Sequence, residues 1–204
     1  MIDEIKSAFK DNKWAIYASI AILFISLILG YVLEPYLHAY LNPIVEDLTQ
    51  KVQTGVIQVT FVDIFFNNFR IILQMFLYGL LFCFSAVILS FNGFFVGYYA
   101  AISPDLFKVI LYIVPHGIFE FSSCILACAS GFTLFNFLFK FLKTFIEVEN
   151  DSVLESLRNS FNVNFIKLKQ AFILFGIAAI LMVIAAVIEV YMTAAIAEFL
   201  LSII

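Results

Sequence analysis

Twenty consecutive residues, from Trp14 to Leu33, carry no charged side chain. A helix of this length is about 30 Å long, which matches the hydrocarbon core of a bilayer. Because lipid offers no hydrogen-bond partners, every backbone amide in such a segment must be bonded within the chain, and a helix achieves this. The run is too long for a typical signal-peptide core and lacks a small-x-small cleavage pattern, so we interpret it as a retained membrane anchor.

The rest of the chain has the same character. Of its 204 residues, 64% are hydrophobic and 13% are charged, and the mean hydropathy is +1.06. These values are typical of an integral membrane protein. There is no linker rich in Gly, Ser or Pro, so residues 1–204 are expected to form one integral membrane domain, and the lack of a basic cluster gives no indication of nucleic-acid binding.

The apolar stretches predict an all-α membrane bundle of about five transmembrane helices. The region 61–103 contains only Asp63 and Arg70 as charged residues. It fits either two short spans with a turn between Leu80 and Ser85, or one long span followed by a re-entrant piece. In the first interpretation the predicted spans are 14–33, 62–81, 85–103, 116–139 and 171–192.

Local signals predict where several helices begin and end. Glu34-Pro35 is expected to end the first span, and Asn42-Pro43 to open a separate amphipathic helix at 43–54. Ser152 followed by Glu155 is a capping-box pattern, which predicts a second amphipathic helix at 152–162.

The apolar run from Leu106 to Phe139 is too long for one straight span, because as a helix it would measure about 50 Å. It contains Pro115 and Gly117, the residues at which a helix breaks most easily. We therefore predict a short segment at 106–114, a helix break at Pro115 and Gly117, and a spanning helix at 116–139.

The distribution of basic residues predicts the orientation. Five spans with a cytoplasmic N-terminus place eight of the eleven Lys and Arg residues inside and leave Lys51, Arg70 and Lys108 outside. Four spans would instead move the basic loop at 140–170 outside, against the positive-inside rule. The chain is thus expected to be a multi-pass protein of the cell membrane, with its C-terminus outside.

His116 and Glu120 are the polar pair within the predicted fourth span, and their spacing of four residues puts them on one helix face. Ionisable groups at membrane depth are costly unless they are paired or hydrated, which makes them candidates for function. We predict an intramembrane polar network of Asn67, Asn68, Asn92, His116 and Glu120, in which Asn92 pairs with His116 or Glu120. Cys124 and Cys128 continue the stripe, but ligands along one helix cannot close around one ion, so no metal site is predicted without a ligand from another helix.

Small residues at intervals of four predict close helix packing. They form two stripes, Gly93, Gly97 and Ala101 in the third predicted span and Ser123, Ala127 and Gly131 in the fourth. These stripes favour packing within the bundle, and whether either also builds a homodimer stays open.

The sequence contains no Ser/His/Asp set, no glycine-rich phosphate loop and only two histidines. We therefore expect no enzymatic activity, no catalytic residues and no cofactor.

Three motifs together resemble the stage II sporulation protein M family. They are Phe66-Asn67-Asn68, then Asn92-Gly93 with Gly97, and the string Pro115-His116-Gly117-Ile118-Phe119-Glu120 with Gly131. The resemblance covers about residues 61–131 and implies a five-span membrane protein of a kind found in bacteria and archaea. The founding bacterial members anchor peptidoglycan-remodelling partners at the septal membrane during engulfment. Most relatives come from organisms that never sporulate, so the resemblance supports the fold better than the role.

We thus expect a non-enzymatic membrane scaffold that recruits membrane or envelope proteins, with the lipid bilayer as its surroundings. The alternative is a transport or channel component in which His116 and Glu120 line a polar pathway. A membrane-embedded metal site is the third and weaker option.

Overall fold

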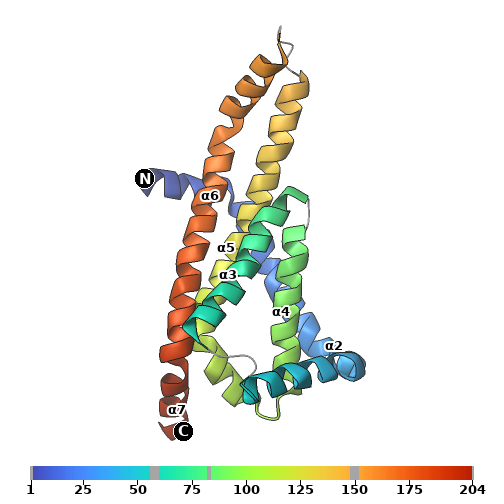
Figure 1. Ribbon diagram of the computed structural model, residues 1–204, viewed down its shortest axis with the longest axis vertical. Coiled ribbons are helices and arrows are strands. Elements are labelled where there is room, and N and C mark those ends of the chain that lie inside the picture. Colours follow the sequence, from blue (N-terminus) through green and yellow to red (C-terminus); the bar gives the residue numbers. More distant parts are fainter. Residues whose placement is uncertain (1, 56–59, 82–83, 148–151, 204) are drawn as a thin grey trace.

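The computed structural model describes residues 2–55, 60–81, 84–147 and 152–203, and these are almost entirely helical. In chain order the elements are α1 (Ile2–Asp11), α2 (Lys13–Gln53), α3 (Phe61–Leu77), the short 3-10 helix η1 (Tyr78–Leu81), α4 (Phe84–Ile102), α5 (Leu106–Glu147), α6 (Val153–Tyr191) and α7 (Thr193–Ile203). Figure 1 shows them as an elongated bundle, and no strand occurs among the described residues.

Five of these segments are long and apolar enough to cross a membrane, namely α2, α3 with η1, α4, α5 and α6. The predicted all-α bundle of five spans is therefore confirmed. The region 61–103 forms two helices that run in opposite directions and diverge from the end at which they are joined (Figure 1), rather than one span and a re-entrant piece. Residues 82 and 83 of the predicted turn lie outside the described residues.

The first span does not end at Pro35, so that prediction is wrong. Helix α2 continues through Pro35 and Pro43 to Gln53, and its later turns lie across one end of the bundle (Figure 1). A proline removes one backbone hydrogen-bond donor, but the backbone hydrogen bonds of the neighbouring turns maintain the helix. Asn42 therefore caps no new helix, and its amide instead donates to the Glu46 carboxylate at 2.7 Å.

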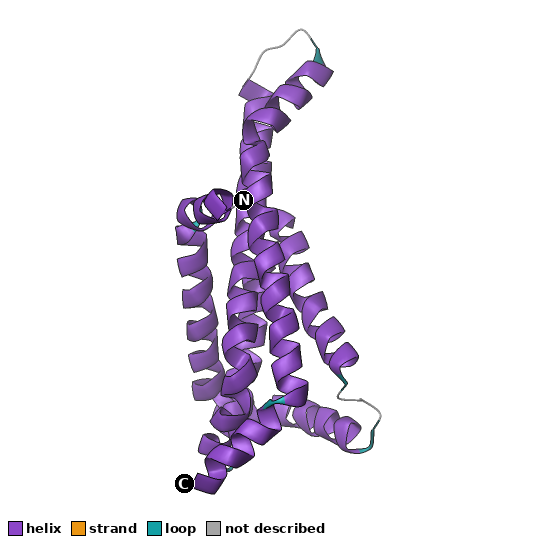
Figure 2. Ribbon diagram, turned by 90° about the vertical axis from the view of Figure 1, so that its left-hand side faces the viewer, coloured by secondary structure: helices purple, strands orange, loops and turns teal. Residues whose placement is uncertain are grey.

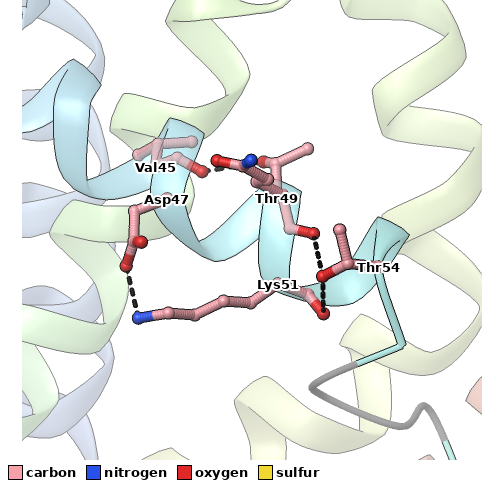
Figure 3. Close-up of polar contacts among 6 residues, drawn as sticks. Val45, Asp47, Thr49, Lys51 and Thr54 are labelled. Carbon is pink, nitrogen blue, oxygen red and sulfur yellow. Dashed lines mark hydrogen bonds and ion pairs between the residues drawn. The ribbon is translucent and has the colours of Figure 1, made fainter.

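The last turns of α2 correspond to the amphipathic helix predicted at 43–54. Their exposed side chains bond within the helix (Figure 3): Lys51 pairs with Asp47 at 2.6 Å, and the hydroxyl of Thr49 donates to the Val45 carbonyl at 2.7 Å. The Thr54 hydroxyl donates to the Gln50 carbonyl at 2.8 Å, next to the end of the helix. This segment is thus a continuation of the first span and not a separate helix.

The predicted break at Pro115 and Gly117 is also wrong. Helix α5 is continuous from Leu106 to Glu147 with Pro115 inside it. Figure 1 shows its first turns at an angle to the rest, which is the bend a proline produces without interrupting a helix. The long apolar run is accommodated by this bend, and by extension of the helix beyond the other spans (Figures 1 and 2).

Helix α6 begins where the capping pattern predicts. The Ser152 hydroxyl accepts a hydrogen bond from the Glu155 backbone N–H at 3.1 Å. The helix then continues to Tyr191, so residues 152–162 are the first turns of the last span and not a helix of their own. Together α5 and α6 form a helical hairpin, here residues 140–147 and 152–170, that extends past α3 and α4 (Figure 2).

Helix α1 crosses this arrangement where the hairpin leaves the bundle. Its Glu4 pairs with Lys169 of α6 at 2.5 Å, and its Asp11 carboxylate accepts from the Gln170 amide at 2.7 Å. Asn12, between α1 and α2, donates to the Gln170 side-chain oxygen at 3.1 Å. The hairpin base is therefore held by these polar contacts in addition to apolar packing, in which Ala8 and Ala171 are buried.

Candidate functional site

The residues of the predicted polar network lie in separate parts of the structure. Asn67 and Asn68 lie near the start of α3, where the Asn67 amide donates to the Asn68 side chain at 3.4 Å. The Asn92 amide in α4 donates to the sulfur of Cys124 at 3.7 Å, and not to His116 or Glu120. The structure thus brings only His116 and Glu120 together, so the predicted pairing of Asn92 with either residue is wrong.

His116 and Glu120 lie one turn apart on α5, and both face α6. There they meet Glu189, and ligand atoms of the three side chains all lie within 4.8 Å of one another. We call His116, Glu120 and Glu189 the carboxylate–histidine cluster. All three residues are partly buried, and they lie in two different spans, so the helix packing of the bundle creates the cluster.

Thr193, the first residue of α7, orients the imidazole. Its hydroxyl donates to the Ile188 carbonyl at 3.1 Å and lies 3.2 Å from His116 Nδ1. A threonine hydroxyl carries one proton, so with that proton on Ile188 it can only accept from the imidazole. In the tautomer with the ring hydrogen on Nδ1, the imidazole donates to Thr193 and Nε2 keeps a free lone pair.

Glu189 and Thr193 were missed by the sequence analysis. A signal was present, because Glu189 is the one charged residue in the predicted span 171–192. An isolated carboxylate in an apolar span is a candidate functional residue, and this reasoning applies to Glu189 as it does to Glu120. Its partner, however, lies about seventy positions earlier in the chain, and no local pattern connects the two.

The small residues of the predicted packing stripes lie mostly at helix contacts. Gly93 and Gly97 of α4 lie against the backbone of α2, and Gly131 of α5 lies against Met75 and Ser85. In α5, Ala127 is buried, and the Ser123 hydroxyl donates across to the Ala178 carbonyl of α6 at 2.7 Å. Ala101, near the end of α4, is only partly buried. Gly117 is buried, but the atoms nearest to it belong to its own helix, at Ile113 and Phe121.

Comparison with known proteins places these features in a family. The family described as Stage II sporulation protein M matches residues 19–194, from within the first span to the start of α7, and this range includes the carboxylate–histidine cluster. An uncharacterized protein of the archaeon Methanocaldococcus jannaschii is 33% identical over 151 residues, covering 72% of this chain and 78% of the relative. No solved structure matches. The chain, a helical protein with five membrane-spanning segments, therefore belongs to the stage II sporulation protein M family.

Proposed function

We propose that this protein is a non-enzymatic scaffold of the cell membrane that recruits a partner through its α5–α6 hairpin. The observation that carries the proposal is the extension of the two hairpin arms, residues 140–147 and 152–170, beyond the other spans (Figures 1 and 2). The α6 arm of the hairpin, from Val153 to Lys169, is about 25 Å long at 1.5 Å per residue. A projecting hairpin of this length offers a partner a surface clear of the lipid.

The end of the hairpin supports docking. Ile146, Val153 and Leu154 are 79%, 69% and 77% exposed, although the surrounding segment is polar. Large apolar side chains exposed to water together are typical of a protein or membrane contact. An apolar, membrane-associated or envelope protein segment is the partner class that fits them.

The interior of the hairpin is ordered by its own contacts, so it can present that surface in a fixed form. The rings of Phe137 and Phe161 meet edge to face with centroids 6.2 Å apart. Nearer the end, the Asn164 amide donates to the Thr144 hydroxyl at 3.2 Å. Such contacts reduce the conformational entropy that a partner has to remove on binding.

The positive-inside rule supports a cytoplasmic hairpin. α1 and the hairpin carry most of the basic residues and lie toward the same end of the molecule, whereas the C-terminus lies at the other (Figure 1). In this orientation the N-terminus is cytoplasmic and the C-terminus outside. A homodimer, if formed, would need a surface other than Gly93 and Gly97, because α2 of the same chain covers both.

Site-specific photocrosslinking in native membranes tests the scaffold. A photoreactive residue at Leu154 is expected to capture a discrete partner, and the same residue at Phe199, exposed on α7, is the matched control. The double substitution Ile146→Lys with Leu154→Lys should abolish the product without altering detergent-extracted yield. Crosslinking that is equal at both positions, or unaffected by the lysines, would contradict docking at the hairpin.

Transport is the second candidate, and the carboxylate–histidine cluster favours it. Ionisable groups facing one another between spans are typical of proton and ion pathways. Reconstituted protein that moves protons into liposomes, with the flux lost in Glu120→Gln, would support this function over the scaffold. Vesicles that stay impermeable to protons with both the wild-type and the Glu120→Gln protein would exclude this transport function.

A further inference from the structure

Three side chains with metal-binding atoms converge between α5 and α6. His116 and Glu120 come from one helix and Glu189 from the other, with their ligand atoms all within 4.8 Å. A stripe on a single helix cannot surround an ion, but two helices facing each other can. The cluster thus supplies the ligand from a second helix that the stripe on α5 lacks.

No Lys or Arg side chain forms an ion pair with the carboxylates of the cluster among the described residues, since the ion pairs there all lie elsewhere. Two neighbouring carboxylates within membrane spans repel each other and lose hydration. A bound divalent cation relieves both effects at once.

The histidine is arranged as metal ligands usually are. The Thr193 hydroxyl lies 3.2 Å from His116 Nδ1, and in the tautomer in which it accepts from Nδ1, the Nε2 lone pair is free to coordinate an ion. Metal-bound histidines commonly give their other ring N–H to such a second-shell acceptor, which fixes the tautomer and the ring orientation. Thr193 itself is buried, which keeps its hydroxyl from turning to water.

We propose that His116, Glu120 and Glu189 bind one divalent transition-metal ion. One imidazole nitrogen and two carboxylate oxygens suit Zn²⁺ or Fe²⁺ better than Mg²⁺ or Ca²⁺, which prefer oxygen alone. Ligand atoms around a tetrahedral zinc ion lie roughly 3.4 Å apart, so side-chain movements of about an ångström close the site. Three protein ligands leave one coordination position open.

Metal analysis of the purified chain tests this site. The full-length protein in detergent is stripped with a chelator, loaded with Zn²⁺ or with Co²⁺ as a spectroscopic probe, and freed of unbound metal. We expect about one ion per chain by mass spectrometry, and a visible Co²⁺ absorption band typical of low coordination. Glu120→Gln and Glu189→Gln should each lower zinc affinity at least tenfold, whereas Glu198→Gln, an exposed glutamate on α7, should leave it unchanged.

A second variant keeps the test independent of the folding of the carboxylate variants. Thr193→Val retains all three ligands and removes the acceptor for His116 Nδ1, so zinc affinity should fall about tenfold while melting temperature without metal changes little. Equal affinity in the wild-type and Thr193→Val chains would overturn the role of Thr193 in positioning the His116 ring. Failure of the wild-type chain to retain either ion, or full retention in the Glu120→Gln, Glu189→Gln double variant, would overturn the site.

Discussion

Single glycines determine how close α2 and α4 approach. A Cβ added at Gly97 would overlap the backbone carbonyl of Leu27, and one at Gly30 would overlap that of Phe94. The contact is therefore between the two helix backbones. No flexible side chain is present that could move to make room for an added Cβ. In lipid, where apolar burial provides little force between helices, such contact is a main source of association.

Gly97→Ala should therefore destabilise the protein, by about 1–3 kcal/mol, because the added methyl group overpacks the contact with α2. The matched control is Gly176→Ala on α6, where a Cβ meets nothing within 4 Å. There the higher helix propensity of alanine should stabilise by up to about 1 kcal/mol. Unfolding in detergent followed by circular dichroism measures both changes, and a shift of the same sign in both variants would contradict this account.

The polar residues show where local reasoning succeeds and where it ends. The shared face of His116 and Glu120 follows from helical geometry, and the structure retains it. The partner of Asn92 could not be derived in this way. The rotation of α4 that brings Gly93 and Gly97 against α2 turns Asn92 toward Cys124 instead. That rotation depends on packing between helices and is not visible in either sequence segment alone.

At the scale of elements, the prolines were the main source of error. Pro35, Pro43 and Pro115 lie inside helices, although each was expected to end, open or break one. In water a proline often ends a helix, because the backbone groups that lose their helical hydrogen bonds can bond to solvent instead. Within or beside a membrane the chain gains more by bending and keeping its remaining backbone bonds.

The docking of α1 on α6 should depend on pH. The hydrogen bond and charge of Lys169 lower the pKa of Glu4, and hydrogen bonds from Ser7 and Gln170 lower the pKa of Asp11. A carboxyl whose pKa is lower in the docked state stabilises docking above its usual range, and loses that contribution as pH falls through the lowered pKa. We expect α1 to loosen in acid.

Distances between spin labels on α1 and α6, measured from neutral to acidic pH in nanodiscs, should broaden as the carboxylates protonate. In a chain carrying Glu4→Gln and Asp11→Asn the distribution should no longer change over the same range. A pH response that persists unchanged in this double variant would assign the effect to other groups.

At the scale of the whole molecule, an odd number of spans separates the two ends of the chain. α1 and the hairpin lie toward one end of the bundle, and α7 with the C-terminus lies at the other (Figure 1). From the distribution of basic residues, the positive-inside rule predicts that the end with α1 and the hairpin faces the cytoplasm. Topology and function are thereby linked, because the proposed docking surface and the carboxylate–histidine cluster fall on different sides of the bundle.

Cysteine accessibility in intact cells checks this topology. In a chain carrying Cys83→Ser, which leaves the buried Cys124 and Cys128, Glu198→Cys should react with a membrane-impermeant maleimide. Arg158→Cys in the hairpin should react only after lysis. The reverse pattern would invert the orientation, and labelling of both before lysis would contradict five spans.

The sequence by itself determined the number of spans, the cap at Ser152 and the family. Each depends on hydropathy or hydrogen bonding within one segment, and such short-range effects can be followed along the chain. Only the tertiary structure decided that Glu189 joins His116 and Glu120, that α4 packs its glycines on α2, and that the prolines bend rather than end their helices. The physical reason is that these outcomes depend on the relative rotation and depth of helices far apart in sequence, and that is settled by packing in three dimensions.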